Sequence, residues 1–156
     1  MKPDLLAFAF FRKHREYAAI FIRLIIGAFL IWGVQDNILS YERMQEFERF
    51  LAARGVPLPL LAAHVSVYAQ FICGVSVLLG AFVRLTSILL IINFIAALII
   101  AHRNDTFAGM FPALVMLAAG FFFLFHGAGR PSVDAALDKR TQHRRAESLR
   151  QAEHSR

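Results

Sequence analysis

Four long apolar runs, separated by short polar stretches, dominate the pattern of this 156-residue chain. They extend over residues 17–34, 59–80, 84–101 and 107–125. Each run is close to the ~20 residues that a helix needs to cross a ~30 Å hydrocarbon core. A segment that crosses lipid must be helical, because every backbone N–H and C=O has to find its partner within the segment. We therefore predict an all-α, integral membrane four-helix bundle.

The stretch between the first two runs has the pattern of a short amphipathic helix. Ser40 is suited to cap its start. Apolar side chains then recur on one stripe at helical spacing, at Tyr41, Met44, Phe47 and Leu51. In the first extracytoplasmic loop, we expect this helix to rest on the outer membrane surface or to close over the bundle.

The two ends of the chain lie outside the apolar runs. Residues 1–16 contain a short apolar stretch, 5–11, followed by a basic run, and we expect a cytoplasmic or interfacial segment in the headgroup layer. Residues 135–156 are basic and lack aromatic side chains, which predicts a disordered cytoplasmic tail that contacts anionic lipid. These assignments leave residues 17–134 as one transmembrane domain.

Composition and charge narrow the class and predict the orientation. Hydrophobic residues make up 58% of the chain, and its net charge of +6 comes from Lys and Arg beside the apolar runs. That placement favours anionic lipid over nucleic acid as a partner. Twelve Lys and Arg flank the four runs on one side and four on the other. The positive-inside rule therefore predicts that both termini are cytoplasmic, in a bacterial-type inner membrane.

Two polar side chains interrupt the hairpin formed by the second and third runs. If the chain turns near Phe82, Gln70 and Asn93 come to the same depth, close to the middle of the membrane. Burying either amide without a partner is costly, so one interpretation is a mutual hydrogen bond that fixes the hairpin. The functional alternative is that the two amides hold the carbonyl group of a quinone or another small polar headgroup.

A second group of polar side chains is expected at the outer end of the bundle. Asp36 ends the first run, His64 lies one turn inside the second, and His102 ends the third. A carboxylate beside two imidazoles could bind a divalent metal or relay a proton to a bound quinone. The alternative is that all three are solvated at the membrane surface. The sequence contains no metal-binding motif of high specificity.

An arginine within the first run predicts a contact between the two ends of the fold. Arg23 lies about 9 Å along the helix from its inner end, where a lone guanidinium is expensive. Asp134 follows a glycine-containing turn after the fourth run, and this turn could fold it beneath the bundle. We predict an Arg23–Asp134 ion pair that closes the cytoplasmic side. The alternative is that Arg23 reaches lipid phosphate.

Several motifs resemble the DoxX family of small four-helix membrane proteins, over about residues 17–137. They are Arg23, Gly27 and Trp32-Gly33 in the first run, Gly55-Val56-Pro57 before the second, and the ending Gly127-Ala128-Gly129-Arg130-Pro131-Ser132-Val133-Asp134. Two positions depart from what such proteins often carry. Asp36 stands where a lysine is common, and Gln70 stands where a glutamate is common.

The resemblance implies a role in a redox-linked membrane assembly. Relatives are associated with quinone-linked sulfur oxidation and with membrane anchoring of oxidant-detoxifying enzymes. We expect a non-enzymatic subunit or anchor whose partner is a redox enzyme and which has no cofactor of its own. Such a subunit could also form an oligomer. The alternative is a quinone-interacting oxidoreductase subunit, similar to thiosulfate:quinone oxidoreductase. Cys73 is the only cysteine and no haem-ligand set is present, which favours the first reading.

Overall fold

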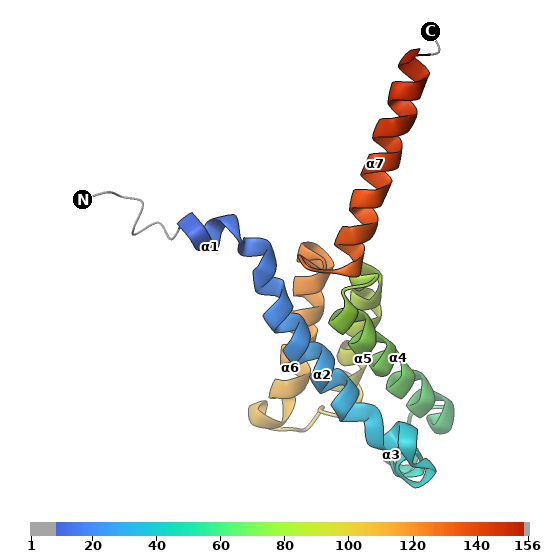
Figure 1. The fold of residues 1–156 in the computed structure, drawn as a ribbon. Coiled ribbons are helices and arrows are strands. Elements are labelled where there is room, and N and C mark those ends of the chain that lie inside the picture. Colours follow the sequence, from blue (N-terminus) through green and yellow to red (C-terminus); the bar gives the residue numbers. More distant parts are fainter. Residues whose placement is uncertain (1–8, 155–156) are drawn as a thin grey trace, which may run out of the picture.

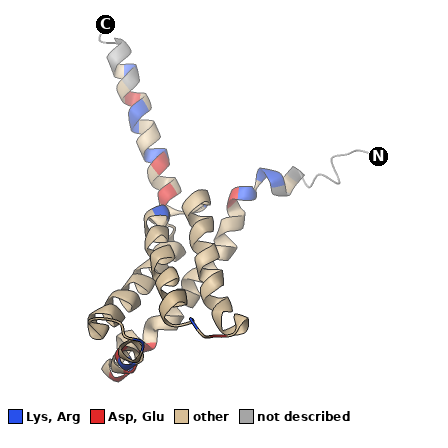
Figure 2. Ribbon diagram, turned by 180° about the vertical axis from the view of Figure 1, so that it is seen from behind, with Lys and Arg blue, Asp and Glu red and all other residues tan. Residues whose placement is uncertain are grey.

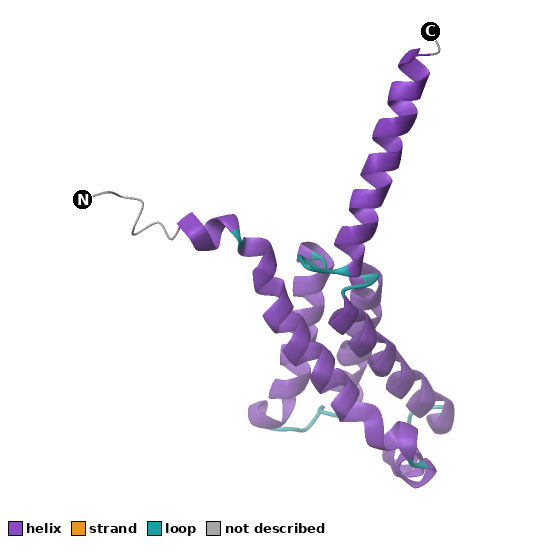
Figure 3. Ribbon diagram, viewed as in Figure 1, coloured by secondary structure: helices purple, strands orange, loops and turns teal. Residues whose placement is uncertain are grey.

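The computed structural model describes residues 9–154 and contains helices and loops but no strand in that range (Figure 1; Figure 3). Four of its helices are long and apolar enough to cross a membrane. They are α2 (Ala18–Leu39, preceded by the 3-10 turn η1, Arg15–Tyr17), α4 (Pro59–Leu79), α5 (Val83–Ile100) and α6 (Phe107–His126). The all-α membrane class predicted from the apolar runs is confirmed.

The four long helices pack in sequence around one apolar core. α2 packs mainly on α4, α4 on α5, and α5 on α6, whereas α2 and α6 contact each other only slightly. The largest fully buried apolar side chains are Phe123, Leu30 and Leu90. Large apolar side chains also cover the outer faces of these helices, including Phe21 and Ile92. Apolar groups on both faces are expected of helices surrounded by lipid.

The helices α2 and α4 approach each other closely at a pair of glycines. A Cβ on Gly27 would lie 2.9 Å from the carbonyl oxygen of Gly74, and a Cβ on Gly74 would lie 3.0 Å from that of Gly27. Small residues at a helix crossing allow two backbones to approach closely. In lipid the hydrophobic effect does not drive helices together, so this close packing favours their association. This crossing holds α2 beside the α4–α5 hairpin.

Charged residues gather at the two ends of the membrane-spanning helices (Figure 2). One end carries α3 (Tyr41–Ala53). The other, which we call the termini end, carries α1 (Ala9–Lys13) and the long helix α7 (Val133–His154). Such a division is expected when the middle of the molecule lies in hydrocarbon, where an unpaired charge is expensive. The buried Arg23, within α2, departs from this pattern.

α3 is the amphipathic helix expected after the first span, and it closes over one end of α2 and α4. Ser40 caps it, its Oγ accepting a hydrogen bond from the backbone N–H of Arg43 at 3.4 Å. Met44 and Leu51 are buried in a small apolar cluster with side chains of α2 and α4, while Tyr41 is exposed. The helix α2 is also longer than the apolar run that predicted it. It continues past Val34 through polar residues and ends at Leu39, directly before Ser40.

The C-terminal segment differs from the prediction of a disordered tail. Up to His154 it forms α7, whose first turn is capped by Ser132 Oγ, which accepts a hydrogen bond from the N–H of Ala135 at 3.1 Å. Its many Ala, Arg, Gln and Glu residues are good helix formers. A sequence without an apolar face is typical of disordered segments, but it is also typical of a helix that is exposed on all sides. Of the expected interfacial stretch, residues 5–8 lie outside the described residues.

Candidate functional site

At the termini end, Arg23 is the centre of a buried hydrogen-bond network. Arg23 is 3% exposed, and its guanidinium donates to four backbone carbonyls. Nε donates to Val77 and Nη2 to Leu78, each at 2.8 Å. Nη1 donates to Pro131 at 2.6 Å and to Ala128 at 3.3 Å. The side chain of one helix therefore joins the last turn of α4 to the loop between α6 and α7.

The position of Arg23 follows from the chemistry of a helix end. The last four carbonyls of a helix have no partner within it, and they form the negative end of the helix dipole. Val77 and Leu78 belong to this last turn of α4. The planar guanidinium presents several donors in a fixed fork, so a single side chain reaches both. Carbonyl oxygens thus compensate a charge that would otherwise be costly to bury.

Asp134 has the complementary position at the start of α5. Its carboxylate accepts hydrogen bonds from the backbone N–H groups of Phe82, at 2.7 Å, and Val83, at 3.1 Å. Its own N–H donates to the carbonyl of Gly80 at 2.9 Å. A negative group is stabilised at this positive end of a helix dipole. Asp134 therefore fastens the first turn of α7 to the α4–α5 turn.

The ion pair predicted between Arg23 and Asp134 is not formed; each side chain binds backbone instead. The sequence correctly suggested that both residues meet at one end of the fold. The prediction weighed an acidic side chain and lipid phosphate as partners of Arg23 but not backbone groups. A tight hairpin places the free carbonyls of one helix beside the free amides of the next. We call Arg23, Asp134 and the backbone groups that they bind the Arg23–Asp134 network.

Gly80 lies at the centre of this network, in the turn between α4 and α5. Its φ of +68° is a conformation that side chains rarely adopt. A Cβ at this position would lie 2.5 Å from the Cβ of Ser132 and 2.6 Å from Nη2 of Arg23. The guanidinium and the α6–α7 loop can approach the turn only because residue 80 has no side chain.

In the middle of the spans, Gln70 and Asn93 are linked through Ser66. The Ser66 hydroxyl donates to Oδ1 of Asn93 at 2.9 Å and accepts from Nε2 of Gln70 at 3.3 Å. Of the two interpretations of this pair, the mutual hydrogen bond is thus formed through the Ser66 hydroxyl and not directly. The signal that could have found Ser66 is its spacing, since residues four apart share a helix face. Nδ2 of Asn93 is buried and has no acceptor in the described part of the chain.

We expect Ser66→Ala to destabilise the protein more than Gln70→Leu does. The first change leaves both amides without their partner, at a cost of about 1 kcal/mol, whereas the second leaves the Ser66–Asn93 bond intact. Denaturant titration of both variants in mixed micelles measures the difference. An equal or smaller loss in Ser66→Ala would show that the hydroxyl does not hold the hairpin.

The structure does not bring Asp36, His64 and His102 into one site. His64 bonds through Nδ1 to the carbonyl of Leu60 at 2.8 Å, and His102 bonds through Nδ1 to Oδ2 of Asp105 at 2.7 Å. Among the residues that the structure describes, no three His, Cys, Asp or Glu side chains could hold a metal ion together. Residue spacing predicts depth in the membrane but not position around the bundle. Each histidine instead uses a partner close in sequence.

Comparisons with known proteins identify relatives of this chain. The DoxX family model matches residues 17–103, which include α2, α3, α4 and α5. The uncharacterized membrane protein Rv3486 of Mycobacterium tuberculosis is 30% identical over 139 residues, which cover 79% of this chain and 83% of the relative. No solved structure matches the chain.

Proposed function

Because the chain belongs to the DoxX family of membrane proteins, we propose that it is a non-enzymatic subunit that anchors a redox or detoxification enzyme to the membrane. The observation that carries this proposal is α7. This 22-residue helix extends away from the membrane-spanning helices (Figure 1). Its described side chains from Ala136 onward are exposed and mostly polar or charged. A polar helix that, beyond its first turn, packs on no other element of the described chain is suited to bind a second protein.

The Arg23–Asp134 network supports the same role. Asp134 belongs to the first turn of α7, and it is bonded to the start of α5. Arg23 holds the loop that leads into α7 against the end of α4. An anchor has to hold its partner at a defined place relative to the membrane. Fastening the base of α7 to three membrane-spanning helices serves that requirement.

We also propose that the termini end is cytoplasmic, because it carries most of the Lys and Arg residues. In a Cys73→Ala background, Glu46→Cys in α3 and Ser148→Cys in α7 are expected to react with an impermeant thiol reagent from opposite sides. The α3 cysteine should react on intact cells of a bacterium whose outer membrane has been opened. The α7 cysteine should react only after the inner membrane is permeabilised. Reaction of both before permeabilisation would contradict this orientation.

Purification from native membranes in mild detergent tests the anchor. The full chain is compared with a chain that ends after Asp138, which retains Asp134 and its bonds to α5. We expect an oxidoreductase or an oxidant-detoxifying enzyme to be purified with the full chain and lost from the shortened one. If the same proteins accompany both chains, α7 is not the docking element and the proposal fails.

Asn93 favours a second candidate function, that of a quinone-interacting oxidoreductase subunit similar to thiosulfate:quinone oxidoreductase. Its Nδ2 is a buried donor without an acceptor, which costs free energy, and a quinone carbonyl would supply the acceptor. Extraction of quinone from the purified chain tests this candidate. Quinone that is present in the wild type and lost in Asn93→Leu would support it. A wild-type sample without quinone would contradict it.

A further inference from the structure

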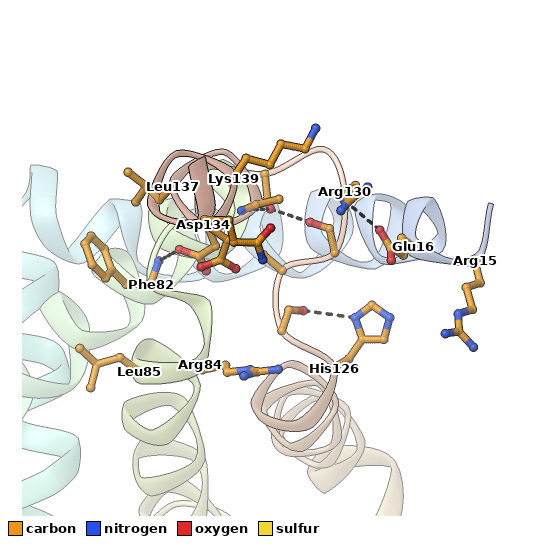
Figure 4. Close-up of a pocket in the computed structure, with 17 residues that line it drawn as sticks. Arg15, Glu16, Phe82, Arg84, Leu85, His126, Arg130, Asp134, Leu137 and Lys139 are labelled. Atoms are coloured by element: carbon orange, nitrogen blue, oxygen red, sulfur yellow. Dashed lines mark hydrogen bonds and ion pairs between the residues drawn. The ribbon is translucent and has the colours of Figure 1, made fainter. Parts of the chain in front are cut away.

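The termini end contains an open pocket of about 1020 Å³ (Figure 4). Its walls are η1, the start of α5, the loop between α6 and α7, and the first turns of α7. Leu85, 64% exposed on α5, lies at the side of the pocket where the apolar surface of the membrane-spanning helices begins. A ligand in this pocket would therefore meet charged groups and an apolar surface together.

Two of the acidic side chains that line the pocket are already engaged. Oε2 of Glu16 forms an ion pair with Nε of Arg130 at 3.0 Å. Both carboxylate oxygens of Asp134 accept hydrogen bonds from the backbone N–H groups at the start of α5. Glu16 is therefore paired with Arg130, and the Asp134 carboxylate compensates the positive end of the α5 dipole.

The remaining charged side chains of the pocket are mostly positive. Arg15, Arg84 and Lys139 make no side-chain hydrogen bond or ion pair within the described part of the chain. Asp138 is the one acidic lining residue, among those described, that is likewise unengaged. Counted over all the described lining residues, four cations (Arg15, Arg84, Arg130 and Lys139) outnumber three carboxylates (Glu16, Asp134 and Asp138), which leaves one excess positive charge around the pocket. An anion in the pocket would compensate this excess.

Arg84 has surroundings unlike those of Arg23. Both arginines lie at the termini end, and Figure 4 shows Arg84 extending from α5 toward the α6–α7 loop. A Cβ on Gly127 of this loop would lie 3.3 Å from Nε of Arg84. Arg23 uses its donors on four carbonyls, whereas the donors of Arg84 have no acceptor in the described chain. A free guanidinium fork matches the oxygens of a phosphate group.

We propose that this pocket is a binding site for a phosphate group and that Arg84 is its principal ligand. Arg15 on η1 and Lys139 on α7 line the same pocket and add positive charge around it. Two sources carry this chemistry, the headgroup of an anionic phospholipid and a soluble phosphate. The exposed Leu85 beside the pocket gives a lipid acyl chain a surface to follow.

Ligand-dependent stabilisation of the purified full chain tests the site. Short-chain phosphatidylglycerol is titrated in one arm and inorganic phosphate in the other, and the unfolding temperature gives an apparent affinity in each. The wild type is compared with Arg84→Gln, Arg84→Lys and Arg150→Gln. Arg150→Gln is the matched control, because it removes the same charge from the exposed far part of α7.

We expect Arg84→Gln to weaken the effective ligand about tenfold, since it removes a charge-assisted bidentate contact. The apparent affinity of Arg84→Lys should lie between those of the wild type and Arg84→Gln, and that of Arg150→Gln should equal the wild-type value. A tenfold loss in the phosphatidylglycerol arm alone identifies a lipid headgroup, and a loss in both arms identifies any accessible phosphate. Equal affinities of Arg84→Gln and Arg150→Gln in both arms would overturn the proposal. The unfolding temperatures without ligand verify that all variants are folded.

Discussion

Arg23→Gln is expected to destabilise the protein by about 3 kcal/mol or more. The change removes a buried guanidinium that donates to four carbonyls, two of them at the end of α4. Those carbonyls would lose the guanidinium inside the protein, where water cannot easily replace it, and only Val77 among the α4 pair would keep a backbone donor in the described chain, the N–H of Gly80. Denaturant titration in mixed micelles measures the loss in the free energy of unfolding.

Two further arginine variants show whether the carbonyl bonds cause that loss. Arg84→Gln removes the same charge from the same end but breaks no hydrogen bond in the described chain, so its stability should stay close to that of the wild type. Arg23→Lys keeps the charge but reaches fewer carbonyls, so its free energy of unfolding should lie between those of Arg23→Gln and Arg84→Gln. Equal losses in Arg23→Gln and Arg84→Gln would mean that the network contributes nothing beyond charge.

Gly80→Ala is expected to cost about 3 kcal/mol, from a strained backbone and from a steric clash. The new Cβ would lie 2.5 Å from that of Ser132 and 2.6 Å from Nη2 of Arg23. Either the turn or the guanidinium has to move, so the hydrogen bonds of the network weaken as well. The same mixed-micelle titration detects the change.

Gly55→Ala separates the strain from the clash. Gly55 has a similar φ of +74°, but a Cβ there would meet nothing within 4 Å. Its substitution should therefore cost only the backbone strain, about 1 kcal/mol. A loss in Gly80→Ala no larger than that in Gly55→Ala would contradict the close packing of Arg23 and Ser132 on the turn.

The membrane-spanning helices could be predicted because hydrophobic length is a local property of the sequence. The last three apolar runs became helices with nearly the expected bounds, the first extended beyond Val34 to Leu39, and the Ser40 cap was recognisable from residue type alone. α7 was missed for a physical reason. A segment without an apolar face gives no periodic signal, although its helix propensity is high.

The site was predicted only in part, because its main partners are backbone atoms. Depth along the helices correctly brought Arg23 and Asp134 to one end, and Gln70 and Asn93 to one level. Every residue has the same backbone carbonyl and amide groups, so residue types do not show which of these groups are free at a helix end. The hydrogen bonds of the network could therefore not be inferred from side chains. The positions of Asp36, His64 and His102 depend on rotation about each helix, which spacing alone leaves undetermined.

We expect the Arg23–Asp134 network to fix α7 on the membrane-spanning helices. In a Cys73→Ala background, spin labels are attached to cysteines introduced by Leu89→Cys on α5 and Ser148→Cys on α7. Pulsed electron paramagnetic resonance then measures the distance between the two labels. We predict one narrow distance distribution in the otherwise unchanged protein and a broad one in both Arg23→Gln and Asp134→Asn. A broad distribution before either substitution, or a narrow one that survives both, would show that the network does not fix α7.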